Sequence, residues 1–164
     1  MTKNLAIFVG VGVLVVAIAL GVILYGTKGS HLEMKVEIVK IRTGVIDEHN
    51  VAAVLDIRLE NLSDVPFEVR EVTVTAEQPK GDKVEGNIIS KADFKQLLEY
   101  NKFLGKQFNE GLSVKDTILP HQKVDRMIAV RFEIPQADLE KAKQIRLWIQ
   151  DMKRVEFEAT KSLQ

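Results

Sequence analysis

Hydrophobic residues are distributed in two different ways along this chain. Residues 5–25 form one uninterrupted apolar run, LAIFVGVGVLVVAIALGVILY, without a charged side chain. From Met34 onward, apolar and polar residues mostly alternate with a period of two. The first pattern is typical of a helix in a bilayer, and the second of half-buried strands. We therefore expect five parts: a short tail (1–4), a transmembrane anchor (5–25), a linker (26–33), a β-sandwich domain (34–158) and a C-terminal tail (159–164).

The apolar run has the length of a membrane-spanning helix. At a rise of 1.5 Å per residue it would span roughly 31 Å, close to the hydrocarbon thickness of a bilayer. A cleaved signal peptide has a shorter apolar core, of about 7–15 residues, followed by a small-x-small cleavage site. Residues 22–26, VILYG, offer no such site. We expect an uncleaved single-pass signal anchor, with a cleaved signal peptide and a buried soluble helix as the alternatives.

The flanks of the anchor suggest its orientation. Lys3 precedes it and Lys28 follows it, so positive charge is nearly balanced across the two sides. Because a short, positively charged N-terminal tail usually stays inside, we expect an inner (plasma) membrane protein whose domain is periplasmic or extracytoplasmic. Tyr25, Lys3 and Lys28 are the expected membrane-interface anchors. Ala17 and Gly21 have the four-residue spacing of a helix-packing face, which would allow a homo-oligomer; ordinary use of small residues is the alternative.

The alternation after Met34 predicts seven to eight strands separated by turns. In VAAVLDIRLEN (51–61), Leu55, Ile57 and Leu59 point to one side, and the charged residues between them point to the other. A change of phase near Arg70–Glu71 predicts a β-bulge. Short alternating strands without repeated βαβ units are typical of an antiparallel β-sandwich. The predicted strands are 35–41, 51–61, 67–76, 84–89, 112–119, 126–134, 144–151 and 154–158.

One helix is expected between these strands, over residues 91–104. Ser90 and Asp93 have the spacing of a capping box, apolar residues follow at helical intervals, and Gly105 is a suitable C-cap. The helix is either a structural cover over an open end or edge of the sandwich, or a lid or partner-binding element. The sequence leaves both interpretations open.

Composition excludes several classes of function. The chain has 23 basic and 23 acidic residues, so no strong positive field attracts nucleic acid. It has no cysteine, which excludes disulfides and thiolate sites. His31, His49 and His121 lie in the linker and in loops, without the spacing of a zinc motif. No nucleophile elbow or phosphate loop is present. We expect no enzyme, no catalytic residues, no cofactor and no metal.

The single tryptophan is the main candidate for an interaction residue. In strand 144–151, three Ile and Leu residues take the inward phase, which turns Trp148 outward beside Arg146. Exposed tryptophan is enriched at binding hot spots. The alternative, which we favour, is that the 91–104 helix covers it or that both faces of this strand are covered. Trp148, Arg146 and Tyr100 are the candidate interface residues.

Four segments give the domain a resemblance to known families: ENLSDVPFEVREVTV, ILPHQ, IAVRFEIP and IRLWIQD. It resembles membrane-anchored bacterial immunoglobulin-like domains and the late-embryogenesis-abundant, water-stress-type β-sandwich, domains of unknown function. The resemblance implies an N-terminal transmembrane helix followed by an immunoglobulin-like antiparallel β-sandwich with one inserted α-helix. It implies no catalytic residues.

These observations favour a non-enzymatic, membrane-tethered interaction or scaffold domain with a protein partner of unknown identity. The alternative is a lipid or small-ligand carrier that uses a cavity between sheet and helix.

Overall fold

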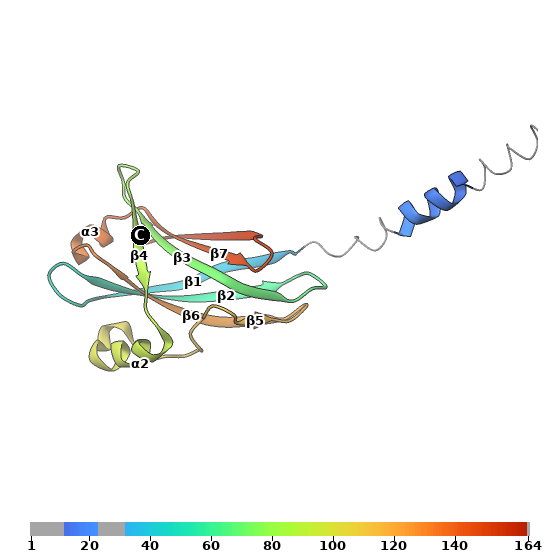
Figure 1. Cartoon of the computed structure of the whole chain (residues 1–164). Coiled ribbons are helices and arrows are strands. Elements are labelled where there is room, and N and C mark those ends of the chain that lie inside the picture. The colour runs from blue at the N-terminus through green and yellow to red at the C-terminus, as the bar shows by residue number, and fades with distance from the viewer. Residues whose placement is uncertain (1–11, 23–31, 164) are drawn as a thin grey trace, which may run out of the picture.

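The computed structural model describes residues 12–22 and 32–163 (Figure 1). Its strands and helices after the linker are, in chain order, β1 (Met34–Val45), β2 (Val51–Asn61), β3 (Phe67–Glu77), β4 (Lys83–Ile88), α2 (Lys91–Tyr100), the 3-10 helix η1 (Lys102–Leu104), β5 (Thr117–Ile118), β6 (Lys123–Phe132), α3 (Gln136–Glu140), β7 (Gln144–Asp151) and β8 (Glu156–Ser162).

Antiparallel ladders join the strands in the order β1-β2-β6-β4-β3-β7-β8, with β5 paired to β3. Two layers enclose the main core, β1-β2-β6 on one side and β3-β7-β8 on the other (Figure 1). Strand β4 belongs to both, because its first residues pair with β3 and its last two with β6. Gly86 lies at this crossing, where a Cβ atom would collide with Val130 and Phe132. The mainly β, antiparallel architecture predicted from the alternation is therefore confirmed.

Two local predictions about the strands are also confirmed. Leu55, Ile57 and Leu59 are buried in the main core. The ladder between β3 and β7 shifts register between Val69 and Glu71, which is the predicted bulge. Both features follow from the local sequence, because successive side chains of a strand point to opposite faces of the sheet. A bulge therefore shows as a change in the alternation of apolar and polar residues.

Helix α2 begins as predicted but ends early. The Ser90 side chain accepts a hydrogen bond from the Asp93 backbone N–H at 3.2 Å. The predicted helix 91–104 is broken at Asn101, whose φ of −112° and ψ of 92° are extended. The 3-10 helix η1 then follows, and Gly105, at a φ of 75°, caps it. The break has a tertiary cause, because the Asn101 side chain bonds to β1 and cannot continue the helix.

The helix covers the outer face of the β2-β6 layer, not an end or edge of the sandwich. Phe94, Leu98 and Leu104 pack on Ala52, Val54, Met127 and Ala129 in a second buried cluster. The prediction that β2 has one solvent-exposed face is therefore wrong for its first half. Residues 51–55 are buried throughout, since the main core lies on one side and α2 on the other.

Several strand boundaries also differ from the predictions. Strand β1 runs to Val45 and not to residue 41, and β6 begins at Lys123 and not at residue 126. The predicted strand 112–119 is reduced to β5, because Lys115 has a φ of 72° and the Ser113 N–H turns back to the Asp116 carboxylate. Strand β8 runs to Ser162, so the domain does not end at residue 158. Its ladder continues because Lys161 pairs with Ile145 and Ala159 packs against the main core.

Of the expected anchor 5–25, the structure describes a helix over residues 12–22. Among the described residues, none belongs to a helix that is long and apolar enough to cross a membrane. Ala17 and Gly21 lie on the described helix. Lys3, Tyr25 and Lys28, the expected interface anchors, lie outside the described residues, as does His31.

Candidate functional site: an aromatic groove beside the β1 edge

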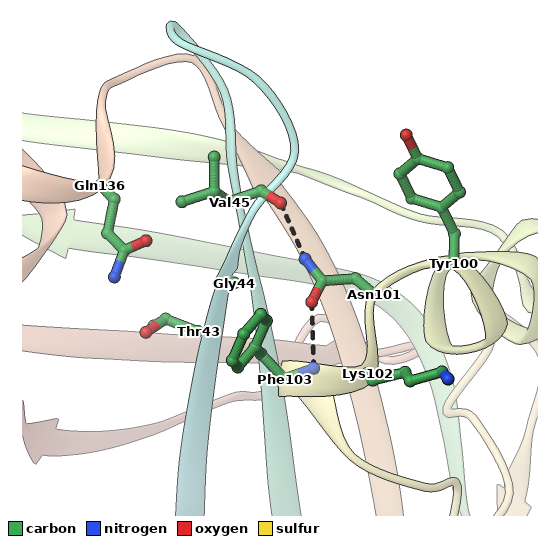
Figure 2. A pocket seen from close by; sticks show the side chains of 8 residues that line it. All are labelled: Thr43, Gly44, Val45, Tyr100, Asn101, Lys102, Phe103 and Gln136. Atoms are coloured by element: carbon green, nitrogen blue, oxygen red, sulfur yellow. Dashed lines mark hydrogen bonds between the residues drawn. The ribbon is translucent and has the colours of Figure 1, made fainter.

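A groove of about 610 Å³ lies where the end of α2 meets the last residues of β1. Its lining comes from three parts of the chain that are distant in sequence. Figure 2 shows the side chains spread around the groove, with β1 running between α3 on one side and α2-η1 on the other. The lining residues are Thr43, Gly44 and Val45 from β1, Tyr100, Asn101, Lys102 and Phe103 from the end of the helix, and Gln136 from α3.

Two aromatic side chains form the open wall of this groove. Tyr100 is 85% exposed and Phe103 is 90% exposed, although both belong to a segment anchored by buried residues. Single exposed apolar side chains are normal on a folded domain, but large ones gathered at one place mark interaction surfaces. The arrangement offers apolar area and few polar groups, which suits binding and offers no catalytic pair.

The aromatic wall is held in place by Asn101, which is 8% exposed. Its Nδ2 donates to the Val45 carbonyl oxygen at 2.7 Å, and its Oδ1 accepts from the Phe103 N–H at 3.1 Å. Gly44 allows this approach, because a Cβ atom there would lie 2.7 Å from Asn101 Nδ2. One buried amide thus fixes η1 against β1, and it satisfies the Val45 carbonyl of β1 together with a free N–H at the start of η1.

A second set of contacts ties the following segment to the sheet. Arg42 NH2 lies 2.8 Å from Asp56 Oδ1, with the two side chains 9% and 17% exposed. The same guanidinium donates to the carbonyl oxygens of Leu104 and Lys106, and lies 5.5 Å from the centre of the Phe108 ring. Asp56 was expected on a solvated face. It is instead largely covered, because the chain after α2 folds back over β1 and β2.

The predicted interface residues do not form one surface. Trp148 and Arg146 alternate with the buried residues of β7 and so lie on the outer face of the β3-β7-β8 layer. Tyr100 is the last residue of α2, which packs on the other layer. The phase of β7 is as predicted, with Ile145, Leu147 and Ile149 buried. The expectation that the 91–104 helix covers Trp148 is wrong, since α2 packs on β2 and β6. Tyr100 alone among the three belongs to the groove.

The surroundings of Trp148 are polar. Trp148 is half-buried, and its Nε1 donates to Glu156 at 3.3 Å. Arg146 donates to Glu158 at 3.0 Å, and Gln150 to Glu156 at 3.1 Å. The register sets Thr73 and Glu158 on either side of Trp148 across the sheet. This face therefore presents one aromatic side chain within a network of cross-strand polar pairs.

The described histidines are not gathered into a site. His121 Nε2 lies 2.8 Å from Asp64 Oδ1, and both side chains are well exposed. His49 lies in the hairpin turn between β1 and β2, where its backbone N–H donates to the Asp47 carboxylate at 2.8 Å. Within residues 12–22 and 32–163, no group of three His, Asp or Glu side chains is arranged to hold a metal ion.

Sequence reasoning missed most of the groove. In the sequence, Phe103 only adds apolar area to the predicted helix, and no pattern singles out Asn101, Gly44 or Arg42. Asn101 and Val45 are 56 residues apart, and Arg42 and Leu104 are 62 apart. A local signal existed only for Asn101, whose residue type often ends helices and accepts from the backbone two positions on.

No family model matches the chain, and no curated protein matches it. Among solved structures, the chain is similar to an ApaG protein from Pseudomonas aeruginosa, with 14% identity, coverage of 71% of this chain and 92% of that chain, and a TM-score of 0.37. It is also similar to the archaellum periplasmic stator protein FlaG from Sulfolobus acidocaldarius, with 12% identity, coverage of 79% and 100%, and a TM-score of 0.35.

A further similar structure is the stator complex of FlaF and FlaG from the same organism, with 12% identity, coverage of 80% and 92%, and a TM-score of 0.38. At these TM-scores the likeness carries no argument.

Proposed function

We propose that this chain is a non-enzymatic, single-pass membrane protein whose immunoglobulin-like β-sandwich binds a partner protein through the aromatic groove. Residues 5–25 are the uncleaved anchor, and the domain lies on the extracytoplasmic side. The apolar run and the short basic tail support this placement.

One observation carries the proposal: Tyr100 and Phe103 are almost fully exposed on a segment that is otherwise rigidly held. Asn101 and Leu104, which flank Phe103, are both buried. Exposed aromatics on a preorganised backbone lose little conformational entropy on binding, and they supply large apolar contact area. The groove beside them can accept a side chain from a partner.

The alternative function, a carrier of a lipid or small ligand, requires a cavity between the sheet and the helix. The space beneath Phe94 and Leu104 is filled, because these residues, 2% and 0% exposed, belong to one buried cluster with Ala52 and Ala129. A second groove, of about 680 Å³, lies at the surface where α2 meets the ends of β4 and β6. The aromatic groove opens to the surface beside the helix and does not extend beneath it. A filled interior supports a binding surface over an enclosed ligand site.

Site-specific photocrosslinking in native membranes tests the partner-binding surface. A benzophenone amino acid at Phe103 of the full-length chain should give a discrete crosslinked protein, and the yield should fall when Tyr100→Ser is added. Leu119, an exposed apolar residue at the other end of the sandwich, is the matched control position. No adduct above that control would overturn the proposal, and an adduct from Trp148 instead would move the interface to the opposite face.

The anchor is tested separately by fractionation. The full-length protein should remain with membranes after carbonate extraction, and protease added to spheroplasts should digest the domain. A soluble mature protein lacking about the first 25 residues would instead support a cleaved signal peptide. Protection of the domain until the inner membrane is opened would reverse the orientation.

A further inference from the structure

We propose that the groove receives an extended segment of the partner, which adds to the free edge of β1 at Thr43–Val45 as an extra strand. The segment carries an apolar side chain next to a carboxylate. This inference rests on the proposed function, since it specifies how the groove would recognise its partner.

The hydrogen-bond phase of β1 leaves backbone groups available at this edge. The Ile46 N–H donates to the Asn50 oxygen at 3.0 Å, and Val45 pairs with Val51. In an antiparallel ladder this makes Val45 and Thr43 members of non-hydrogen-bonded pairs, whose N–H and C=O groups point away from β2. The bond from Asn101 to the Val45 oxygen agrees with this phase.

The available groups are therefore the N–H and C=O of Thr43 and the N–H of Val45. The strand order ends at β1, and no ladder in the described part of the chain pairs its other side. These groups can form the main-chain hydrogen bonds that give affinity in strand addition.

The two halves of the β1 edge differ in how well they are protected against pairing with another strand. The first half carries Lys35, Glu37 and Lys40, and its register shifts between Ile38 and Lys40. Charges and bulges are the usual devices that keep an edge strand from pairing with another chain. The last three residues, Thr43 to Val45, have neither a charge nor a bulge. The edge is thus protected everywhere except beside the groove.

The groove has two sides that could each receive every second side chain of a strand added to β1. Gly44 faces Asn101 and η1, so Thr43 and Val45 face the opposite side, toward Gln136 (Figure 2). Side chains of an added strand would alternate between these two sides. One set would meet the exposed Phe103, and the other would meet Gln136.

The available area indicates the kind of occupant. A buried aromatic side chain contributes about 150–250 Å², so Tyr100 and Phe103 together offer less than the ~800 Å² per partner of a stable interface between globular proteins. A second copy of the domain would need more surface, whereas a short segment would not. Lys102 is the one charged side chain among the groove's lining residues, which favours a carboxylate on the ligand.

Selection from a random heptapeptide display library on the full-length chain in detergent micelles supplies the probe. Selected peptides should combine an apolar residue with an adjacent Asp or Glu. Affinity for the synthetic peptide should fall at least tenfold in Phe103→Ala and remain unchanged in the control Leu119→Ala. With Lys102→Glu, the preference should change from acidic to basic peptides. Failure to select any peptide sensitive to Phe103→Ala would count against the proposed function itself.

Amide hydrogen exchange by NMR distinguishes strand addition from side-chain docking alone. In the free protein the Thr43 and Val45 amides should exchange fast, and a saturating amount of the selected peptide should slow both at least tenfold. Thr43→Pro removes an outward N–H without removing a bond to β2, so it should abolish peptide binding while the thermal midpoint stays close to that of the unaltered protein. If the peptide requires Phe103 but leaves both amides unprotected, the groove binds the partner and the strand-addition inference is wrong.

Discussion

The two outer faces of this sandwich differ sharply, although each is formed by the outward-facing residues of antiparallel strands. On the β2-β6 layer, the outward residues beneath α2 are apolar and mostly small: Ala52, Val54 and Ala129, together with the larger Met127. On the β3-β7-β8 layer, they are mainly charged and polar, and Trp148 stands among them. One face is sealed by a helix and the other is open to solvent.

The comparison shows what decides whether a helix can cover a sheet. Ala52 and Ala129 have short side chains, so Phe94 and Leu98 can pack close to the strands without strain. On the opposite face, Arg146, Glu156 and Glu158 would have to lose their hydration beneath any cover, at a cost that packing alone does not offset. The aromatic groove lies at the border of the covered face, where the helix ends and its last aromatic side chains have no sheet beneath them.

The largest predicted effect concerns the covered face. Phe94→Ala should destabilise the domain by about 3–5 kcal/mol, because Phe94 is 2% exposed and its removal leaves a cavity between α2 and the sheet. Phe103→Ala is a matched control, since it deletes the same side chain from a position that is 90% exposed. Urea unfolding of the full-length chain, followed by circular dichroism, gives both values. Equal losses in the two variants would contradict the packing described for α2.

A smaller effect is expected on the open face. Trp148→Ala should cost about 1 kcal/mol, because Trp148 is half-buried and packs in neither buried cluster. A loss above ~3 kcal/mol would mean that something covers this face in the folded protein. Crosslinking from Phe103 should be unaffected by the same change, since the two residues lie on opposite layers.

The strands and the start of the helix were predictable because their signals are local. Parity along β7 placed Ile145 and Leu147 inward, and Ser90 with Asp93 marked the helix start. The layer that the helix covers was harder to predict, because amphipathicity gives a helix an apolar face but does not name its partner. The run VAAVL at 51–55 did carry a signal, since an apolar residue at every position indicates a strand buried on both faces.

The groove could not be predicted in the same way, because it is made by tertiary contacts. The break at Asn101 depends on a carbonyl of β1, and the position of η1 depends on Arg42. The outward phase of β7 makes Trp148 a candidate interface residue, and the sequence offers no means of separating it from Tyr100 on the predicted helix. Only the strand order separates them, since β7 and the strands beneath α2 belong to different layers.

The smallest predicted effect lies at the uncovered end of the β2-β6 face. There Arg58 and Asp125 are direct cross-strand partners, with Nε–Oδ1 at 2.8 Å and NH2–Oδ2 at 3.0 Å. The hydrogen bond from Arg58 lowers the pKa of the Asp125 carboxyl below its usual value of 3.8. A carboxylate with a lowered pKa in the folded state stabilises the fold at pH values above its unfolded pKa, and this contribution is lost as the pH falls through the folded pKa.

The pair should therefore contribute at pH 7 and contribute nothing once Asp125 is protonated. Asp125→Asn should lower the thermal midpoint slightly at pH 7, and the difference from the unaltered protein should vanish as the pH is lowered from about 5 to about 2. Because both side chains are about 40% exposed, 1 M salt should also reduce the difference. A difference that grows as the pH falls would contradict the assignment. At pH 7 the effect of Asp56→Asn on the thermal midpoint should depend less on salt, because Asp56 and its partner Arg42 are 17% and 9% exposed and burial limits screening.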